Sequence, residues 1–553
     1  MLYSDIPLAQ GVIELIKSYE IKHIVISPGS RNAPLTIGFN EDAYFTCYSV
    51  VDERCAGFFA LGIAQQIQQP VVLVCTSGSA LLNYYPALSE AFYSQIPFIV
   101  LSADRPLNKI DIGDGQTIRQ QNVFANHSWF NANLTEDWTS ENNDLINQAI
   151  QQSIANKGPV HINAPFEEPL YGTTTTLSVV ISKLPKEKLV RTLPQLEWNI
   201  CTESWENATK KLILIGSLNE HQISEETLQN WINDSSVVVF TEVQSNIRNQ
   251  KFINSIDTLI TSFKSVDFEY FKPEILVTIG GMIVSKRIKS FLRKYQPQEH
   301  WHIDELRAYD TFECLTKHVK LQPNVFFEEL YSRVQEIPVS EYQTNILKLK
   351  IQRQQKQSEF APNVPFSDFY VYDELLKKIT PNFQLQIGNS SAIRYAQLFE
   401  IPTDLAVFSN RGTSGIDGAT STAVGAAVGQ NKPVILFTGD ISFFYDSNAL
   451  WNNYIPDSFK IVIINNSGGG IFRILPGHQE KPVFHTYFET QHQLNASHLA
   501  QMFGFEYFQA QDKPSFQTNY QTFLNSPKKA IFEVFTPTEV NNVVLKEYFD
   551  SLV

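Results

Sequence analysis

The residues whose types and spacing best suit metal and phosphate chemistry lie in the last third of the chain. Asp440 follows one apolar run and Asn466 follows the next, 26 positions later, with the glycines 468–470 close behind. Parallel strands that are joined by a helix end at the same sheet edge, so we expect both side chains there. A carboxylate, an amide oxygen and the Gly468 carbonyl suit Mg²⁺, which keeps phosphate oxygens as ligands. The glycines would let backbone N–H groups approach those phosphates.

Each of these residues alone has a simpler interpretation, because Asp and Asn commonly end strands in ordinary turns. Only their combination, each after an apolar strand, favours a metal site. The eleven histidines show no metal-ligand spacing such as HExxH, and no GxxxxGK[ST] phosphate loop occurs. A cation at this edge would therefore depend on oxygen ligands.

Parallel strands are needed to position these residues, and the sequence predicts them along the whole chain. Short β-branched runs alternate with stretches of helical spacing, the pattern of parallel sheets covered by helices. The expected strands, with the loops they enter, lie at 23–30, 70–79, 97–106, 158–170, 211–217, 235–243, 274–283, 300–305, 385–394, 406–418, 433–443, 460–472 and 530–537. Helical spacing marks 53–67, 80–94, 448–455 and a polar segment, 341–360.

This alternation divides the chain into three α/β domains, each with a Rossmann-like parallel sheet. We place them at 1–180, 195–340 and 360–553, separated by linkers that contain prolines. No sequence repeat relates the three. The middle domain lacks a convincing nucleotide fingerprint, so we expect it to hold no cofactor of its own.

Composition excludes several classes of protein. The 553 residues carry 43 Lys and Arg against 57 Asp and Glu, a net charge of −14 that argues against binding nucleic acid or an anionic membrane. No apolar run is long enough to span a bilayer, and the N-terminus does not resemble a signal peptide. The five cysteines form no CxxC pair. We therefore expect a cytoplasmic enzyme with reduced thiols.

The Gly439–Asp440 and Asn465–Asn466 pairs together resemble the fingerprint of thiamine diphosphate enzymes. Ile441 stands where many of those enzymes have glycine, so the match is to a variant form. The resemblance implies a thiamine diphosphate-binding fold and a catalytic glutamate that holds the cofactor's aminopyrimidine ring in its imino form. Glu53, at a strand-to-helix junction, fits that role. Taken alone, it would be a first-turn acid that the helix dipole favours.

Further motifs narrow the resemblance to one family. The chain is similar to the synthases of 2-succinyl-5-enolpyruvyl-6-hydroxy-3-cyclohexene-1-carboxylate in menaquinone synthesis. The similarity is specific in the outer thirds and only general in the middle third. The motifs that carry it are SPGSRNAPLT (27–36), DERCAGFFALG (52–62), TSGSALLNYYPALSEA (76–91), SADRP (102–106), GNSSAIR (388–394), SNRGTSGIDG (409–418), GDISFFYDSNAL (439–450) and NNSGGGIF (465–472).

The resemblance implies a carboligase that depends on thiamine diphosphate and Mg²⁺, or Mn²⁺ in its place. 2-Oxoglutarate would lose CO₂, and the succinyl-semialdehyde unit would add to isochorismate in a 1,4-addition. Both substrates are polyanions, and arginine pairs with carboxylates through two parallel hydrogen bonds. Four arginines follow predicted strands within the family motifs: Arg31, Arg105, Arg394 and Arg411. Taken alone, each would more often be a surface or ion-paired arginine; four such residues in a chain poor in positive charge favour a function. Lys286 could reach the site from the middle domain.

Other family positions carry over one by one. The implied cofactor contacts are Glu53, Ser77, Asn83, Asn389, Ser390, Ile416, Asp440, Ser442, Asn466 and Phe472. Ile416 would be the apolar wedge beneath the cofactor, although simple core packing would use the same residue type. The implied substrate contacts also include Ser30, Gln116, Phe472 and Leu475. The family usually has Ala-Asn before this glutamine, whereas this chain has Asp114–Gly115, so the contacts of that loop are open.

Three alternatives remain open at this point. Another thiamine-dependent 2-oxoacid carboligase, such as an acetolactate synthase, shares the fingerprint. A non-catalytic homologue could bind diphosphate and a metabolite, but it would not need the acid at Glu53. A nucleotide-dependent dehydrogenase lacks a convincing GxGxxG at a strand–helix turn. The family resemblance also implies a homodimer or a dimer of dimers, with each site between two subunits.

Overall fold

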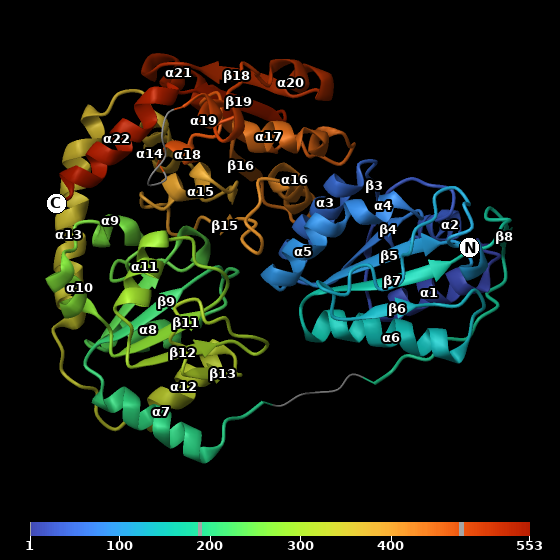
Figure 1. Ribbon diagram of the computed structural model, residues 1–553, viewed down its shortest axis with the longest axis horizontal. Coiled ribbons are helices and arrows are strands. Elements are labelled where there is room, and N and C mark those ends of the chain that lie inside the picture. The colour runs from blue at the N-terminus through green and yellow to red at the C-terminus, as the bar shows by residue number, and fades with distance from the viewer. Residues whose placement is uncertain (1, 186–190, 475–480) are drawn as a thin grey trace.

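Three parallel sheets, each covered by helices, follow one another along the chain in the computed structural model (Figure 1). The structure describes residues 2–185, 191–474 and 481–553. Every strand pair within the three large sheets is parallel. The predicted α/β class is therefore confirmed. Helix α13 (Tyr342–Phe360), the predicted polar helix, precedes the last sheet.

The N-terminal sheet has the strand order β3-β2-β4-β5-β7-β6. Its strands are β2 (His23–Ile26), β3 (Thr46–Ser49), β4 (Val71–Cys75), β5 (Phe98–Asp104), β6 (Asn131–Asn133) and β7 (Pro159–Pro165). Its helices are α1 (Pro7–Ser18), α2 (Ala33–Glu41), α3 (Glu53–Ile67), α4 (Ser79–Asn83), α5 (Tyr85–Ser94) and α6 (Ser140–Ala155). A small antiparallel pair joins β1 (Tyr3–Ser4) to β8 (Thr173–Thr174). The single helix predicted at 80–94 is divided into α4 and α5, because Pro86 starts a new helix.

The middle sheet has the order β10-β9-β11-β12-β13. Its strands are β9 (Lys211–Ile215), β10 (Val237–Thr241), β11 (Ile275–Ile279), β12 (Glu299–Ile303) and β13 (Lys317–Val319). Its helices are α7 (Gln195–Asn207), α8 (Glu225–Asn233), α9 (Ile256–Ile260), α10 (Ser265–Phe271), α11 (Lys286–Lys294) and α12 (Pro323–Arg333). Strands β9, β10 and β11 are buried along both faces, which explains their continuous apolar runs.

The C-terminal sheet has the order β15-β14-β16-β17-β19-β18. Its strands are β14 (Gln384–Ile387), β15 (Val407–Phe408), β16 (Val434–Gly439), β17 (Lys460–Asn465), β18 (Glu506–Ala510) and β19 (Ala530–Phe535). Its helices are α14 (Asp368–Lys378), α15 (Ser391–Ala396), α16 (Ala419–Gly429), α17 (Asp440–Tyr445), α18 (Ile471–Ile474), α19 (Pro482–Tyr487), α20 (Ser497–Phe503), α21 (Lys513–Leu524) and α22 (Thr538–Ser551).

The helix predicted at 448–455 is wrong. The connection between β16 and β17 consists of α17, a short 3₁₀ turn η4 (Ser447–Leu450) and an irregular segment. Side chains there compete with helical hydrogen bonds. The Asn448 amide donates to the Asp52 carboxylate across the sheet boundary at 2.8 Å, and the Asn452 amide oxygen accepts the Tyr454 N–H at 2.9 Å.

The N-terminal and C-terminal sheets share one topology. Numbered by position in the chain, the strands of both sheets run in the order 2-1-3-4-6-5, although no sequence repeat is visible. The carboxyl edges of both sheets carry the predicted site residues. Ser77 and Arg105 follow the third and fourth strands of the first sheet, as Asp440 and Asn466 follow those of the last. The predicted residues therefore follow equivalent strands in the two outer sheets.

Helices α3 and α16 join these two sheets into one continuous hydrophobic core. The helices touch through small residues, and a side chain on Gly62 or Gly425 would clash with the backbone of the opposite helix. Figure 1 shows α3 and α5 facing the C-terminal section across this contact. The first turn of α3, which begins at Glu53, is thereby held against the last sheet.

Within the described ranges, no helix combines the length and the apolar character needed to cross a membrane. All five cysteines are free, and three of them are buried.

Candidate active site

The two strand ends singled out by the sequence meet at the carboxyl edge of the C-terminal sheet. Strands β16 and β17 are hydrogen-bonded neighbours, with Gly439 opposite Ile464. Asp440 therefore lies beside the loop that follows Asn465. The Gly468 N–H donates to the Asp440 carboxylate at 3.0 Å, and Asp440 is almost fully buried. The predicted juxtaposition of Asp440, Asn466 and Gly468 agrees with this geometry.

The amide of Asn466 is oriented by a neighbouring acid. Its Nδ2 donates to the Asp368 carboxylate at 3.1 Å, which leaves Oδ1 as the free acceptor. This Oδ1 is buried and has no hydrogen-bond partner among residues 2–185, 191–474 and 481–553. A buried acceptor without a donor is costly unless a ligand satisfies it. His492 Nε2 also lies 3.3 Å from the Asp440 carboxylate.

These oxygen atoms suit a hard cation, because a buried carboxylate and a buried amide oxygen lie at the same edge of the C-terminal sheet. Among the described residues, no group of three His, Cys, Asp or Glu side chains could hold a metal ion. A metal here would therefore depend on Asp440 together with neutral oxygens. Diphosphate oxygens would complete such a shell, as they do for Mg²⁺.

The 409–418 loop, which contains Arg411 and Ile416, is held against this edge. The Asn389 amide donates to the carbonyls of Asn410 and Gly415, both at 2.7 Å. The Ser442 hydroxyl donates to the Ile416 carbonyl at 2.7 Å. The Ile416 side chain remains 38% exposed, a high fraction for an isoleucine fixed in a loop. This exposure suits an apolar contact with a ligand better than core packing.

Arg411, which belongs to this loop, and Arg394, on α15, each have a donor without a partner among the described residues. Arg411 donates to the Asn389 amide oxygen at 2.6 Å, but the Nε atoms of Arg394 and Arg411 are buried without an acceptor. Burial lowers the pKa of both guanidinium groups. Ser390, between the β14 strand end and α15, has a φ of +65°. A non-glycine residue held in that region is often part of a functional site.

At the edge of the N-terminal sheet, Arg105 connects the remaining predicted residues. Its guanidinium donates to the Ser77 hydroxyl at 2.6 Å and to the Gln116 carbonyl at 3.0 Å. The Asp114 carboxylate lies 3.7 Å from Arg105 Nε. The unusual Asp114 of this loop is therefore a counter-charge that a substrate carboxylate would have to displace.

Three other predicted residues of the N-terminal domain lie apart from Arg105, Ser77 and Gln116. Arg31 is buried and donates to the Phe166 carbonyl at 2.9 Å and to the Glu168 carboxylate at 3.1 Å. Ser30 is exposed beside it. Asn83 is exposed on α4 and donates to the Ser79 carbonyl of its own helix at 3.2 Å.

Glu53 is the first residue of α3 and is half-buried. Burial raises the pKa of its carboxyl, and a hydrogen bond from its own backbone N–H opposes that rise. Its neighbours contact the segment that follows Asp440. Arg54 donates to the Tyr445 carbonyl at 2.7 Å, and the Cys55 thiol lies 3.6 Å from the Asp446 carboxylate.

Lys286 is exposed at the start of α11, where a buried acid fixes the preceding turn. The Glu242 carboxylate accepts the N–H groups of Val284 and Ser285, each at 2.8 Å, and burial raises its pKa to about 7. Phe472 is half-buried, with its ring edge-on to Phe488 at 5.9 Å. Leu475 lies outside the described residues.

Two groups of the predicted residues thus lie at the outer sheet edges, Ser77, Arg105 and Gln116 at one and Asp440, Asn466 and the 409–418 loop at the other. In the described part of one chain, no hydrogen bond or ion pair connects Ser77 or Arg105 to Asp440 or Asn466. Sequence reasoning missed Asp368, which orients Asn466, and Glu90, which holds the 409–418 loop. A sequence signal for Glu90 existed, because an acid stands within the mostly apolar ALSEAF segment of α5.

Comparison with known proteins fits this arrangement. Three thiamine pyrophosphate enzyme models match the chain: the N-terminal TPP-binding domain at 6–128, the middle domain at 186–332 and the C-terminal TPP-binding domain at 386–534. The fold and these matches define a thiamine pyrophosphate enzyme, as predicted.

Curated relatives identify the family within this class. Proteins named 2-succinyl-5-enolpyruvyl-6-hydroxy-3-cyclohexene-1-carboxylate synthase from Flavobacterium johnsoniae and Flavobacterium psychrophilum are 59% and 58% identical to the chain, over the full length of both partners. One from Porphyromonas gingivalis is 36% identical over 99% of this chain and 97% of its own length. The chain belongs to this synthase family, which confirms the resemblance seen in the sequence.

Proposed function

We propose that the chain is a Mg²⁺-dependent transferase that releases CO₂ from 2-oxoglutarate and adds the succinyl-semialdehyde unit to isochorismate. The product would be the 2-succinyl-5-enolpyruvyl-6-hydroxy-3-cyclohexene-1-carboxylate of menaquinone synthesis. The observation that carries the proposal is the buried Oδ1 of Asn466, which has no hydrogen-bond partner among the described residues and lies at the same sheet edge as Asp440. It supports a bound cation, and family membership supports the reaction.

Thiamine diphosphate, when bound, would supply the electron sink for both carbon–carbon bond changes. The chain's own residues would bind and orient the reactants. Asp440, Asn466 and Gly468 would hold Mg²⁺ or Mn²⁺, and Glu53 would hold a proton at the pyrimidine ring. The exposed face of Ile416 would support the cofactor from below.

Arginines would bind the carboxylates of the two substrates, since the chain as a whole is acidic. Arg394 and Arg411 have free donors at the C-terminal edge, and Arg105 lies at the N-terminal edge. Placing both substrates in one site therefore requires the two edges to face each other. We propose a homodimer or a dimer of dimers in which the edges of different subunits do so.

We also propose the domain boundaries 1–180, 195–340 and 360–553, because each large sheet lies within one of these ranges. The middle domain would hold no cofactor. The free, mostly buried cysteines support a cytoplasmic protein.

The reaction can be tested directly with purified protein, thiamine diphosphate and Mg²⁺. Incubation with 2-oxoglutarate and isochorismate should give the coupled product by mass spectrometry. A parallel incubation should replace 2-oxoglutarate with pyruvate. Coupling of pyruvate without any isochorismate adduct would favour an acetolactate synthase-like enzyme and refute the proposal.

The Asp440→Ala variant should lose cofactor binding. At about 100 times the dissociation constant, a ligand stabilises the folded protein by about 2.7 kcal/mol. Thiamine diphosphate with Mg²⁺ should therefore raise the melting temperature of the wild type and leave that of the variant unchanged. Asp457→Ala, which removes an exposed acid from the same section, is the matched control. An equal upward shift in Asp440→Ala would place the metal elsewhere.

Arg105→Ala should separate the two substrates. We expect decarboxylation of 2-oxoglutarate, followed with an artificial electron acceptor, to be retained. The KM for isochorismate should rise about 10–100-fold, the scale of a lost charged hydrogen bond. Arg119→Ala is the control, because Arg119 is 83% exposed in the same loop and pairs with Asp111. Equal loss of both activities would assign Arg105 to the donor side.

A further inference from the structure

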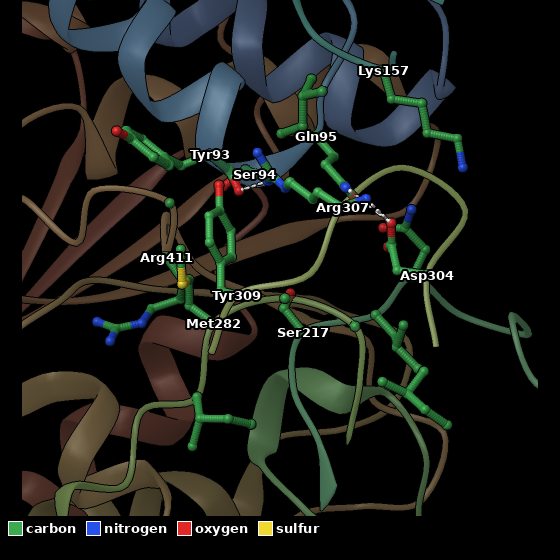
Figure 2. A pocket seen from close by; sticks show the side chains of 18 of the residues that line it. Tyr93, Ser94, Gln95, Lys157, Ser217, Met282, Asp304, Arg307, Tyr309 and Arg411 are labelled. Atoms are coloured by element: carbon green, nitrogen blue, oxygen red, sulfur yellow. Dashed lines mark hydrogen bonds between the residues drawn. The ribbon is translucent and has the colours of Figure 1, made fainter. Parts of the chain in front are cut away.

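Helix α5 lies where the three sections of the chain meet. At its C-terminal end, Arg307 from the middle section donates to the Phe92 carbonyl at 2.7 Å and to the Tyr93 carbonyl. Figure 2 shows this end of the helix, with Ser94 and Gln95, above the pocket that Arg411 also lines. The helix is thus anchored on one side and faces the 409–418 loop on the other.

Glu90 of α5 makes the contact with that loop. Its carboxylate accepts the N–H groups of Gly412 and Thr413, both at 2.7 Å, and the Thr413 hydroxyl at 2.8 Å. The Ser94 hydroxyl donates to the same carboxylate at 2.6 Å. Glu90 is only 1% exposed. In the described part of the chain it forms no ion pair, so these four donors stabilise its charge.

The fit between helix and loop is tight at this point. A Cβ on Gly412 would lie 2.6 Å from the Glu90 carbonyl and 2.8 Å from the Ser94 hydroxyl, distances that no side chain tolerates. The two backbone N–H groups that donate to Glu90 belong to Gly412 and Thr413. These are the two residues immediately after Arg411. Ile416 lies four residues beyond Gly412, and its carbonyl is held by Ser442. The loop is therefore fixed from the C-terminal sheet at one end and from the N-terminal section at the other.

We propose that Glu90 is a positioning residue that holds Arg411 and Ile416 in their working places through the backbone of the 409–418 loop. The inference rests on the proposed function, in which both residues serve the active site. Glu90 touches neither cofactor nor substrate in this arrangement. Each carboxylate oxygen of Glu90 accepts one backbone N–H group. Glutamine in its place would direct its own amide N–H group toward one of these donors, and that hydrogen bond would be lost.

The test compares Glu90→Gln with Ser89→Ala. Ser89 is on the same helix and is half-buried, and its side chain makes no hydrogen bond in the described structure. Hydrogen exchange, read by mass spectrometry in the cofactor-free protein, should accelerate in peptides covering 412–413 of Glu90→Gln and stay unchanged in Ser89→Ala. The kcat/KM of Glu90→Gln should fall about 10–100-fold. Ser89→Ala should remain within about twofold.

Unchanged exchange at 412–413 in a folded Glu90→Gln protein would overturn the proposal, even if activity fell. Should that variant fail to fold, Thr413→Val removes one of the donors, and exchange there should still accelerate, to a smaller degree. Unchanged exchange in Thr413→Val would then overturn it. The exchange measurement needs no substrate, so a wild type that made no isochorismate adduct would refute the proposed reaction without deciding this contact.

Discussion

The Glu53→Gln variant should fold and bind thiamine diphosphate normally and lose about 10²–10⁴-fold in turnover, the scale of lost acid–base assistance. Glutamine keeps the shape and one hydrogen bond but cannot exchange a proton with the pyrimidine ring. Burial raises the pKa of the half-buried Glu53 carboxyl, the direction that makes proton sharing with the ring easier. Turnover with saturating substrates and the cofactor-dependent melting shift would be measured together.

Glu14→Gln is the matched control for this variant. Burial also raises the pKa of Glu14, which lies on α1, so the substitution makes the same chemical change in a similar environment. We expect near-normal turnover from Glu14→Gln. Near-normal turnover in Glu53→Gln as well would remove Glu53 from the catalytic role.

The juxtaposition of Asp440 and Asn466 could be predicted from sequence because it depends only on local features. Each follows a continuous apolar strand, and two parallel strands in succession end at one edge. The shared strand order of the outer sheets could not be predicted. Packing between helices and sheet faces determines that order, and different apolar residues satisfy it equally well, so no sequence repeat remains.

The supporting acids were missed for a different reason. Asp368 orients the Asn466 amide across 98 positions, and Glu90 accepts donors 322 and 323 positions away. Nothing in the local sequence identifies such distant partners. The helix wrongly predicted at 448–455 shows the same limit, because the Asn448 amide donates to Asp52 in another section. Contacts between the N-terminal and C-terminal domains therefore determine the conformation of residues 448–455 and of the 409–418 loop.

The two sheet edges that carry the predicted residues can meet either within one chain or between two chains. Within a chain, α3 packs on α16, and Arg54 and Cys55 contact the segment after Asp440. Yet no described contact links Arg105 to the Asp440 edge. We expect sites between subunits, so that Glu53 of one chain serves Asp440 of its partner. Complementation of two inactive variants tests this.

Glu53→Gln and Asp440→Ala homodimers should each be nearly inactive. If the sites lie between subunits, their heterodimer has one doubly altered site and one wild-type site. Unfolding and refolding the two variants together should then recover up to about half of the wild-type activity per heterodimer. If each site lies within one chain, every site carries a lesion and activity stays at background.

A reciprocal mixture makes the result decisive. A chain that carries both substitutions is refolded with the wild type, and heterodimers are isolated by size and by a tag on one chain. Sites between subunits would then each contain one lesion, so the heterodimer should be inactive. If each site lies within one chain, the wild-type subunit keeps its intact site. The heterodimer should then have half the activity of the wild-type homodimer. The two mixtures must give opposite outcomes, and only activity in the first with none in the second supports a site shared between subunits.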